Sequence, residues 1–483
     1  MAAQMGFYGL GVMGKNLCLN LLDHGVSLCA TDYLPANTAA LAASGHPLLE
    51  TAESEQALCA GLEKPRCIFL MIKAGAAVDQ TIERFLPWLE PGDILMDGGN
   101  SYFLDTIRRF RDLAEKGIRY LGVGVSGGAS GARNGPALMV GGDRTAYDRM
   151  APILTAIAAK VNGEPCCNYV GEDGAGHFVK TVHNGIEYAD MQLISEVYDL
   201  ACRGRGLSPS VIGELFAQLN TGVAESYLMT ITAEILGTLD PLTGQPLVFV
   251  VGDQAVQNGT GSWAAEQALR LGMPATLLSS AVFARSRSAD RDLRQKVTDT
   301  MKLKMRHAQT ADTLHGTGTP EPTELESLAR ALLLGRILTY AEGFCLMKAA
   351  ARHNNWTMDL SAVARIFRGG CIIRSGLLEP IAKAYTDNPD LVHLLADRAI
   401  ADLASTLIDG LIATTLDAVG LGLPVPVLTA AASELAALND MNLPTSLIQA
   451  QRDYFGAHTF KRKDREGRFH FDYDSRTIDQ LPG

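Results

Sequence analysis

The sequence predicts an α/β N-terminal domain with a mainly parallel sheet, followed by an all-α C-terminal domain and an extended C-terminal tail. Short apolar runs alternate with helical patterns over residues 5–175, which is typical of repeated βαβ units. From about residue 177 the strand signals mostly stop, and long Ala/Leu-rich segments follow. The end of the chain is richer in aromatic and charged residues. We therefore expect one domain over 1–176, a helical domain over 177–440, and a tail over 441–483 that packs on another surface.

The composition limits the class of protein. With 483 residues, 47% of them apolar, the chain is long enough for two or three folded units. Its formal net charge of −11 argues against nucleic acid or an anionic membrane as a partner, although a local basic cluster can still bind a small anion. The nine cysteines are scattered without a C-x-x-C pair, so we expect neither a metal site nor a disulfide framework. The start is not leader-like and no apolar stretch reaches the ~20 residues of a membrane span, so a cytoplasmic protein is expected.

The strand candidates of the α/β domain are the apolar runs "MGFYGL", "VSLCATD", "CIFLMI", "DILMDGG" and "YLGVGVSG". The first leads into "GLGVMG", which places Gly9, Gly11 and Gly14 in the G-x-G-x-x-G spacing at the start of a helical pattern. Glycines at these positions allow a tight turn and a close approach of the backbone to a pyrophosphate, whose negative charge the helix N-terminus favours. The pattern in this context predicts a Rossmann domain that binds a dinucleotide.

Asp32 indicates which dinucleotide is bound. It ends the second strand candidate about twenty residues after the glycines, where a carboxylate can accept a hydrogen bond from the ribose 2′-hydroxyl of NAD. The same carboxylate would repel the 2′-phosphate of NADP, and the next residue is Tyr33 rather than an arginine. Lys73 in "MIKAG" is the nearest candidate cation for that phosphate. NAD is therefore the predicted cofactor, with NADP as the alternative.

The stretch "FVKTVHNGIEYADMQ" fits either a solvated helix face or a set of catalytic groups. At about 100° per residue, Lys180, His183, Asn184 and Glu187 fall within an arc of roughly 100° opposite an apolar face. Any amphipathic surface helix has such a polar face, so the periodicity leaves both interpretations open. A desolvated lysine could accept a hydroxyl proton and a glutamate could later donate one. This pair suits a reaction that oxidises an alcohol and then reprotonates a carbon.

Six motifs in order carry a family resemblance: "GLGVMG", "MIKAG", "DGGNS", "VSGGASGARNGPALMVGG", "GAGHFVKTVHNGIEYADMQL" and "RDYFGAHTF". With these motifs the chain resembles the 6-phosphogluconate dehydrogenase (decarboxylating) family over essentially its whole length. The resemblance implies that Lys180 acts as general base and then as general acid, and that Glu187 protonates the carbon left by loss of CO2. It also implies a homodimer in which the tail of one subunit completes the site of the other.

The remaining site residues are also implied by the resemblance. The cofactor would meet Gly9, Gly11, Val12, Met13, Gly14, Asp32, Tyr33, Lys73, Ala74 and Asn100. The sugar acid would meet Asn100, Ser126, Gly127, Gly128, His183, Asn184 and Tyr188. Its phosphate would lie near Asn258, Thr260 and Arg285, with Arg452 and His458 supplied by a second subunit. Arginine suits this role because its donors form a fixed fork that matches phosphate.

The chain departs from the family pattern at several positions. Residues 32–34 read Asp-Tyr-Leu where an NADP-type member has Asn-Arg-Thr, which agrees with the prediction of NAD. Asn258 and Ser262 stand where the family commonly has lysines. One lost charge-assisted contact costs roughly 1.5–3 kcal/mol, so we expect weaker phosphate binding rather than its loss. Ala129 and Ser130 replace common acidic residues, a change that nothing in the sequence explains.

Three functions are therefore weighed. The first is an NAD-preferring 6-phosphogluconate dehydrogenase of the pentose phosphate pathway. The second is a related enzyme for another 3-hydroxy sugar acid, such as gluconate, with Asn258 as an adaptation. The third is a dinucleotide-binding regulatory protein without catalysis. The joint presence of Lys180, His183, Asn184 and Glu187 argues against the third, because a protein without catalysis has no chemical need for them.

Overall fold

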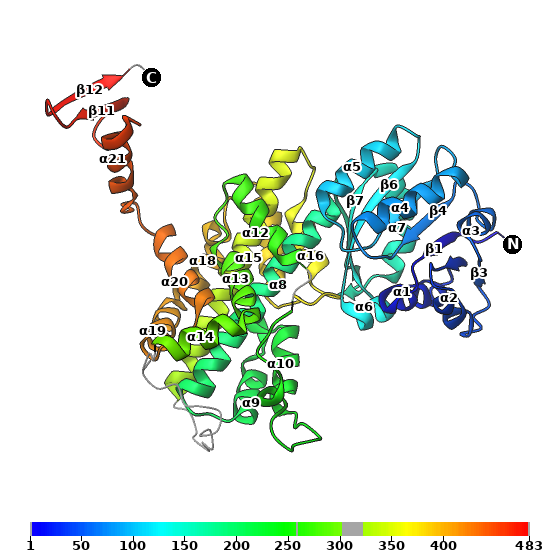
Figure 1. The fold of residues 1–483 in the computed structure, drawn as a ribbon, viewed down its shortest axis with the longest axis horizontal. Helices are drawn as coiled ribbons and strands as arrows, with labels where there is room; N and C mark the ends of the chain where they lie inside the picture. Colours follow the sequence, from blue (N-terminus) through cyan, green and yellow to red (C-terminus); the bar gives the residue numbers. More distant parts are fainter. Residues whose placement is uncertain (1, 257–258, 302–321, 482–483) are drawn as a thin grey trace. The chain divides into compact units, whose positions relative to one another are not determined.

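The computed structural model describes residues 2–256, 259–301 and 322–481. The chain forms two compact units, Met1–Ala431 and Ala432–Gly483. The first unit begins with an α/β domain and continues into a helical part (Figure 1). The predicted fold class is therefore confirmed.

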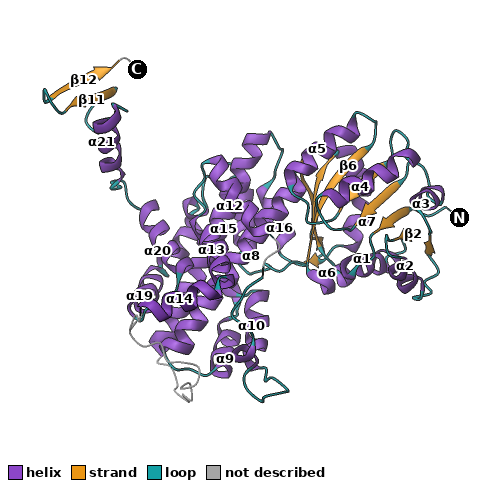
Figure 2. Ribbon diagram, viewed as in Figure 1, coloured by secondary structure: helices purple, strands orange, loops and turns teal. Residues whose placement is uncertain are grey.

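Within the described residues, the α/β domain is built on an eight-stranded sheet with the order β10-β7-β6-β5-β4-β1-β2-β3 (Figure 2). Its strands are β1 (Met5–Tyr8), β2 (Leu28–Thr31), β3 (Leu49–Thr51), β4 (Cys67–Leu70), β5 (Ile94–Asp97), β6 (Arg119–Ser126), β7 (Ala137–Gly142) and β10 (Cys167–Gly171). Neighbouring strands pair in parallel, except that β6 and β7 are antiparallel. The carboxyl ends of β1, β2, β4, β5 and β6 therefore lie along one edge of the sheet.

Helices cover both faces of this sheet. They are α1 (Val12–Asp23), α2 (Pro35–Ala42), α3 (Glu55–Ala60), α4 (Ala76–Phe85), α5 (Phe103–Ala114), α6 (Gly128–Asn134) and α7 (Arg144–Ile157). Apolar side chains of α1 and α7 form one core with one face of the sheet. Those of α3, α4 and α5 form a second core with the other face. Two buried faces explain why the strands read as continuous apolar runs rather than as alternating patterns.

The helical part begins with α8 (Ala175–Asp199), which packs on β6 and β7 near its start and on α15 further along (Figure 1). The helices that follow are α9 (Pro209–Leu219), α10 (Tyr227–Gly237), α11 (Leu247–Val250), α12 (Thr260–Leu271), α13 (Thr276–Ala289), α14 (Arg291–Met301), α15 (Pro322–Asn354), α16 (Leu360–Phe367), α17 (Leu378–Asp387), α18 (Arg398–Ser405), α19 (Ile408–Gly420) and α20 (Pro426–Leu438). Among the described residues no single helix is long and apolar enough to cross a membrane, while α18 and α19, bent by 48° at their break, pass that test only as a pair.

Glycines allow α8 to lie directly on the sheet. A Cβ added at Gly176 of α8 would come within 2.1 Å of the Gly122 carbonyl oxygen and 2.6 Å of the Gly141 nitrogen. A Cβ added at Gly124 of β6 would come within 2.6 Å of the Lys180 Cβ. Helix and strands therefore meet backbone to backbone, and this contact fixes the height of Lys180 above the sheet.

The second unit is organised around a buried carboxylate. It contains α21 (Thr445–Gly456) and an antiparallel hairpin of β11 (Arg468–Asp472) and β12 (Thr477–Leu481), which the sequence analysis did not predict. Asp453 of α21 is fully buried and accepts hydrogen bonds from the backbone N–H groups of Thr459 and Phe471. Its carboxylate also lies 2.9 Å from Nδ1 of His470. These contacts tie the helix to the first strand of the hairpin.

Candidate active site

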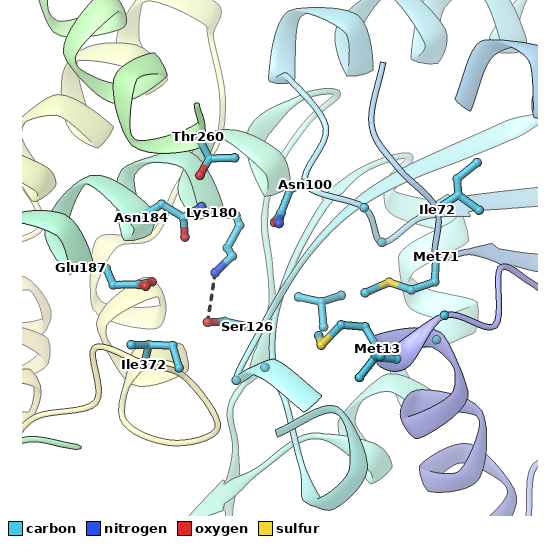
Figure 3. Close-up of a pocket in the computed structure, with 18 of the residues that line it drawn as sticks. Met13, Met71, Ile72, Asn100, Ser126, Lys180, Asn184, Glu187, Thr260 and Ile372 are labelled. Carbon is cyan, nitrogen blue, oxygen red and sulfur yellow. Dashed lines mark hydrogen bonds between the residues drawn. The ribbon is translucent and has the colours of Figure 1, made fainter. Parts of the chain in front are cut away.

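A pocket of about 550 Å³ opens where the carboxyl ends of the strands meet α8 (Figure 3). It is lined by Gly11, Val12, Met13, Gly14, Met71, Ile72, Gly98, Gly99, Asn100, Val125, Ser126, Gly127, Gly128, Lys180, Asn184, Glu187, Tyr188, Thr260 and Ile372. Residues from both the α/β domain and the helical part therefore share one cavity. The carboxyl edge of a sheet of this type is where ligands usually bind.

The glycine-rich turn fits a dinucleotide. A Cβ at Gly14 would lie 1.9 Å from the Gly9 carbonyl oxygen, so the turn cannot close with a larger residue there. Gly11 caps α1 without a side chain, which leaves the first N–H groups of the helix free of a side-chain cap. Those N–H groups and the helix dipole suit a pyrophosphate. Val12, next to Gly11, is 73% exposed, so the turn is open to a ligand.

Asp32 is held in place at the end of β2. Its Oδ2 accepts a hydrogen bond of 2.5 Å from the Leu10 N–H, and its Oδ1 accepts one of 2.7 Å from the Leu34 N–H. Asp32 therefore also braces the glycine-rich turn, which the sequence analysis did not foresee. A carboxylate oxygen has further lone pairs, so these two bonds leave acceptor capacity for ribose hydroxyls.

Five residues that were expected to contact the cofactor lie outside the pocket lining. Gly9, Asp32, Tyr33, Lys73 and Ala74 do not line the pocket itself. The Tyr33 side chain is 75% exposed, Lys73 is exposed and Ala74 is half-buried. All five belong to the turn or loop that follows β1, β2 or β4 at the carboxyl edge.

Arg84 was missed by the sequence analysis, which named Lys73 as the nearest candidate cation. The Arg84 guanidinium carbon lies 5.8 Å from the centroid of the Tyr33 ring. It reaches this place from the last turn of α4, which packs beside β1. The sequence carried no signal for this contact, because it depends on how α4 packs on the sheet.

The polar face of α8 is buried, whereas the amphipathic pattern suggested a face open to solvent. Lys180 is 8% exposed, His183 is fully buried and Asn184 is 7% exposed. The Glu187 side chain is 21% exposed. The apolar face is buried as well, with Phe178, for example, completely enclosed. The helix therefore crosses the interior with Lys180, Asn184 and Glu187 directed into the pocket (Figure 3), whereas His183 does not line the pocket.

Lys180, Ser126 and His183 form a connected group. The Lys180 Nζ donates to Ser126 Oγ over 3.1 Å and lies 3.3 Å from His183 Nδ1. The Ser126 hydroxyl is also 3.1 Å from His183 Nε2. Nδ1 of His183 is further placed 3.2 Å from Asn184 Oδ1 and 3.7 Å from Glu187 Oε2. The strand end of β6 and one face of α8 thus hold the amine at a defined point.

Burial shifts the pKa values of Lys180 and Glu187 in opposite directions. Removal from water lowers the pKa of the Lys180 amine, while the Glu187 carboxylate acts against that change. Burial raises the pKa of Glu187, and the charges of Lys180 and Arg285 oppose the rise. Burial also keeps the pKa of His183 well below its usual value, so its imidazole is neutral. Burial therefore shifts the Lys180 amine towards its neutral form and the Glu187 carboxyl group towards its protonated form, the forms in which they can act as a base and an acid.

The other end of the pocket is suited to an anion. Thr260 is the first residue of α12 and faces Asn100 and Asn184 across the pocket (Figure 3). The Arg285 guanidinium carbon lies 3.5 Å from the centroid of the Tyr188 ring, so a cation stands beside the pocket wall. Asn258 lies outside the described residues.

An aromatic contact joins the two parts of the first unit near this end. The ring of Tyr102, which follows β5, lies 4.9 Å from the ring of Trp263 in the first turn of α12. The Tyr102 hydroxyl accepts a hydrogen bond of 3.0 Å from Gln267 Nε2. Helix α12 is therefore anchored to the loop that also carries Asn100.

Arg452 and His458 belong to the second unit. Both are exposed there, and Arg452 Nη1 donates to Gln449 Oε1 over 3.2 Å. The His458 ring lies 6.0 Å from the Phe455 ring. Both residues were expected to contact the substrate phosphate in the site of a second subunit.

Several pocket residues were not named from the sequence. They are Met71, Ile72, Gly98, Gly99, Val125 and Ile372. The first five lie within or beside the motifs "MIKAG", "DGGNS" and "VSGGASGARNGPALMVGG", so their position after a strand was an available signal. Ile372 comes from the segment after α16, far along the chain, and only the tertiary structure brings it to the pocket. Within the described part of the chain no cluster of three or more His, Cys, Asp or Glu side chains could hold a metal ion.

Comparison with known proteins identifies the family. The model for the NAD binding domain of 6-phosphogluconate dehydrogenase matches residues 4–171, and the model for the C-terminal domain of 6-phosphogluconate dehydrogenase matches residues 176–473. The chain belongs to the 6-phosphogluconate dehydrogenase family. The predicted resemblance and the predicted class of enzyme, an NAD(P)-dependent oxidoreductase, are therefore confirmed.

Individual members of the 6-phosphogluconate dehydrogenase family match nearly the whole chain. The NADP(+)-dependent decarboxylating enzyme of Bacillus subtilis is 44% identical, with 97% of this chain and 99% of that protein covered. The NAD(+)-dependent decarboxylating enzyme of the same organism is 42% identical, with 96% and 98% covered. A solved structure of Plasmodium falciparum 6-phosphogluconate dehydrogenase superposes with a TM-score of 0.91 at 37% identity, covering 97% of this chain and 99% of that one. Because both NAD- and NADP-dependent relatives match, family membership alone does not assign the cofactor.

Proposed function

We propose that the protein catalyses the oxidative decarboxylation of 6-phosphogluconate to ribulose 5-phosphate and CO2, with NAD as its preferred cofactor. The observation that carries this proposal is the pair of buried proton-transfer groups, Lys180 and Glu187, in a pocket that also contains the glycine-rich turn. The Plasmodium falciparum relative was solved in complex with NADP+ and with 6-phosphogluconate. A substrate of this class is consistent with a pocket that has a base, an acid and an anion-binding end.

The cofactor would be held by this chain's own backbone and one carboxylate. The N–H groups at the start of α1, after Gly11, would bind the pyrophosphate, and Asp32 would accept hydrogen bonds from the adenosine ribose. When bound, the nicotinamide ring would accept the hydride from C3 of the sugar acid. A 2′-phosphate would meet the negative charge of Asp32, which supports the preference for NAD.

Lys180 would act on the C3 hydroxyl of the substrate. Its neutral amine would take the hydroxyl proton, and loss of hydride from C3 then leaves a β-keto acid. As the carboxylate leaves as CO2, its bonding electrons pass towards the C3 carbonyl oxygen. The Lys180 ammonium, held by Ser126, would hydrogen-bond this oxygen and return the proton to it, which stabilises charge where it develops.

Glu187 would complete the reaction by protonating carbon. The carbon that has lost CO2 becomes C1 of ribulose 5-phosphate, and the protonated Glu187 carboxyl would donate to it. As it does so, the Lys180 amine, again neutral, would take the proton from the adjacent enol hydroxyl, which re-forms the carbonyl group. The neutral His183 imidazole, within reach of both Lys180 and Ser126, would keep these groups oriented. The sugar acid would be bound by Asn100, Ser126, Gly127, Gly128, Asn184 and Tyr188. Its phosphate would be bound by Thr260 and Arg285, and more weakly at Asn258 than at the lysine that the family commonly has there.

We propose that the active form is a homodimer. The second unit exposes large apolar side chains on α21, with Leu447 65%, Ile448 55% and Phe455 72% exposed, which favours burial against another chain. Arg452 and His458 would then contribute to the phosphate end of the neighbouring site. Deletion of residues 445–483 should abolish activity and leave the first unit folded. A truncated chain that is monomeric in sedimentation and still active would contradict this.

Initial rates test the proposed reaction directly. They would be measured with 6-phosphogluconate and with gluconate, each with NAD and with NADP, while CO2 release is followed. We expect NAD-dependent turnover of 6-phosphogluconate with about one CO2 released per NADH formed. Faster turnover of gluconate would instead favour the enzyme for an unphosphorylated sugar acid, and binding of NAD without turnover of either acid would favour the regulatory protein.

A further inference from the structure

A group of four side chains stands at the carboxyl edge beside Asp32, outside the pocket. Tyr8 ends β1 directly before Gly9, and Tyr33 directly follows Asp32. Arg84 reaches over from α4, with its guanidinium carbon 5.7 Å from the Tyr8 ring centroid and 5.8 Å from that of Tyr33. Glu55 begins α3 and completes the group. These side chains surround the place where the ribose 2′-position is expected, given the proposed role of Asp32.

Glu55 holds the Arg84 guanidinium in its present position. The Arg84 Nε lies 3.0 Å from Glu55 Oε1, and its Nη2 donates to the Tyr8 hydroxyl over 2.7 Å and to Thr81 Oγ1 over 3.2 Å. Glu55 is the first residue of α3, and its position at the start of that helix brings its carboxylate against Arg84. Burial raises the pKa of Tyr8 to about 12, so its hydroxyl stays neutral. The guanidinium therefore has one charged partner, Glu55, and two neutral ones in these contacts.

The Arg84 guanidinium remains accessible to a ligand. Its side chain is 41% exposed, compared with 22% for Glu55. Tyr33, on which it lies, is 75% exposed. An arginine with part of its donor fork facing solvent can exchange partners at little cost, and phosphate competes well with carboxylate for such a fork. The group thus contains a cation near the 2′-position and a carboxylate that holds it.

We propose that Arg84 and Glu55 determine cofactor specificity together: Glu55 keeps Arg84 from pairing with a 2′-phosphate. This proposal rests on the dinucleotide site described above and adds two residues to it. With Glu55 ionised, a 2′-phosphate would meet two carboxylates, Glu55 and Asp32, and an arginine that is already paired. Once the charge of Glu55 is removed, the same arginine becomes a ligand for that phosphate.

The test measures binding rather than turnover. Affinities for 2′,5′-ADP and for 5′-AMP, which differ only in the 2′-phosphate, would be measured by calorimetry at low salt. We expect Glu55→Gln to raise the affinity for 2′,5′-ADP by about tenfold, the size of one charge-assisted contact, with 5′-AMP changed less than about twofold. The gain should vanish in Glu55→Gln combined with Arg84→Met, or with Arg84→Gln if the first combination is unstable. It should also shrink as salt is raised, because both partners are partly exposed.

A matched control separates this effect from the general loss of negative charge. Glu90 also holds a cation on the same domain, with its Oε1 2.6 Å from Lys64 Nζ, but it lies just before β5 at the amino edge of the sheet. Glu90→Gln makes the same charge change and should leave 2′,5′-ADP binding as in the wild type. A gain in Glu90→Gln, a gain that survives loss of Arg84, or no gain in Glu55→Gln would each overturn the proposal. NAD-dependent turnover of 6-phosphogluconate, measured on the same variants, tests the proposed function separately.

Discussion

Gly124→Ala should displace the proposed base without replacing any residue that is proposed to perform chemistry. The new methyl carbon would lie 2.6 Å from the Lys180 Cβ, 3.0 Å from the Gly176 carbonyl oxygen and 3.1 Å from Met139 Sδ. Carbon atoms in ordinary contact are about 3.5–4.0 Å apart, so α8 has to move outward by about 1 Å near Lys180. Met139 can yield by a rotamer change, whereas the Lys180 Cβ and the Gly176 carbonyl oxygen can be relieved only by a shift of α8 itself.

A shift of this size has a defined effect on rate. Misplacement of a reacting group by about 1 Å costs about a hundredfold, which corresponds to about 2.7 kcal/mol of transition-state stabilisation. We expect kcat to fall by about that factor, while calorimetry gives a dissociation constant for NAD within about twofold of the wild type. The overpacked contact should also lower the free energy of unfolding by about 1–3 kcal/mol, measured by denaturant titration.

Gly420→Ala provides the matched control. It makes the same chemical change in α19, where an added Cβ meets no atom within 4 Å. Replacement of a helical glycine by alanine there should be neutral or slightly stabilising and should leave kcat unchanged. If Gly124→Ala kept the wild-type kcat and stability, the close packing of α8 on β6 would not be what positions Lys180.

The remaining predictions concern Lys180, Glu187 and the cofactor. Lys180→Met and Glu187→Gln should each abolish turnover while NAD still binds by calorimetry, and substantial activity in the Lys180 variant would refute its assignment as the base. Lys180→Met should also raise the melting temperature at neutral pH, because folding lowers the pKa of the Lys180 amine. The buried ammonium therefore destabilises the folded state by the full amount below the folded-state pKa. This destabilisation disappears as the pH rises towards the usual pKa of 10.5. In the wild type, kcat/KM should rise with pH through the lowered pKa of Lys180. Lys180→Arg should lose turnover across the whole pH range, so this rise should be absent. The wild type should prefer NAD over NADP in kcat/KM by at least about tenfold, or roughly 1.4 kcal/mol, and Asp32→Asn with Tyr33→Arg should erase or reverse this preference through KM for the cofactor. Because Asp32 also accepts hydrogen bonds from two backbone N–H groups, that double variant should melt at a lower temperature, and a wild type that used NADP better would contradict the role of Asp32.

The apolar runs of the sequence located five strands of the eight-stranded sheet and missed the other three. The five predicted runs correspond to β1, β2, β4, β5 and β6, which are fully or almost fully buried. The missed strands are β3, β7 and β10. Strands β3 and β10 form the two edges of the sheet and are partly exposed, so burial left a weaker signal in their composition. Strand β7 is fully buried, and its run "ALMVGG" was not named as a strand candidate. Strands β6 and β7 pair antiparallel because only residues 127–136 connect them. A parallel crossover usually needs a dozen or more residues.

Periodicity identified which residues of α8 share a face, but it could not say what covers that face. Lys180, His183, Asn184 and Glu187 do lie together, as an angle of about 100° per residue requires. Their burial depends on β6 and on segments such as the one around Ile372, which are distant in sequence. For the same reason the sequence named Lys73 rather than Arg84 as the nearest cation, since loop position could be read from the motif and the packing of α4 could not.

The contact between Tyr102 and Trp263 gives the protein a built-in optical probe. The chain has three tryptophans, and Trp263 is the one in the first turn of α12, next to Thr260. Its indole touches a phenol ring on the loop of Asn100, so its emission depends on the distance between that loop and α12. With Trp88 and Trp356 replaced by phenylalanine, the fluorescence of the remaining indole would report each movement of these two elements as ligands enter, in real time and without an attached dye.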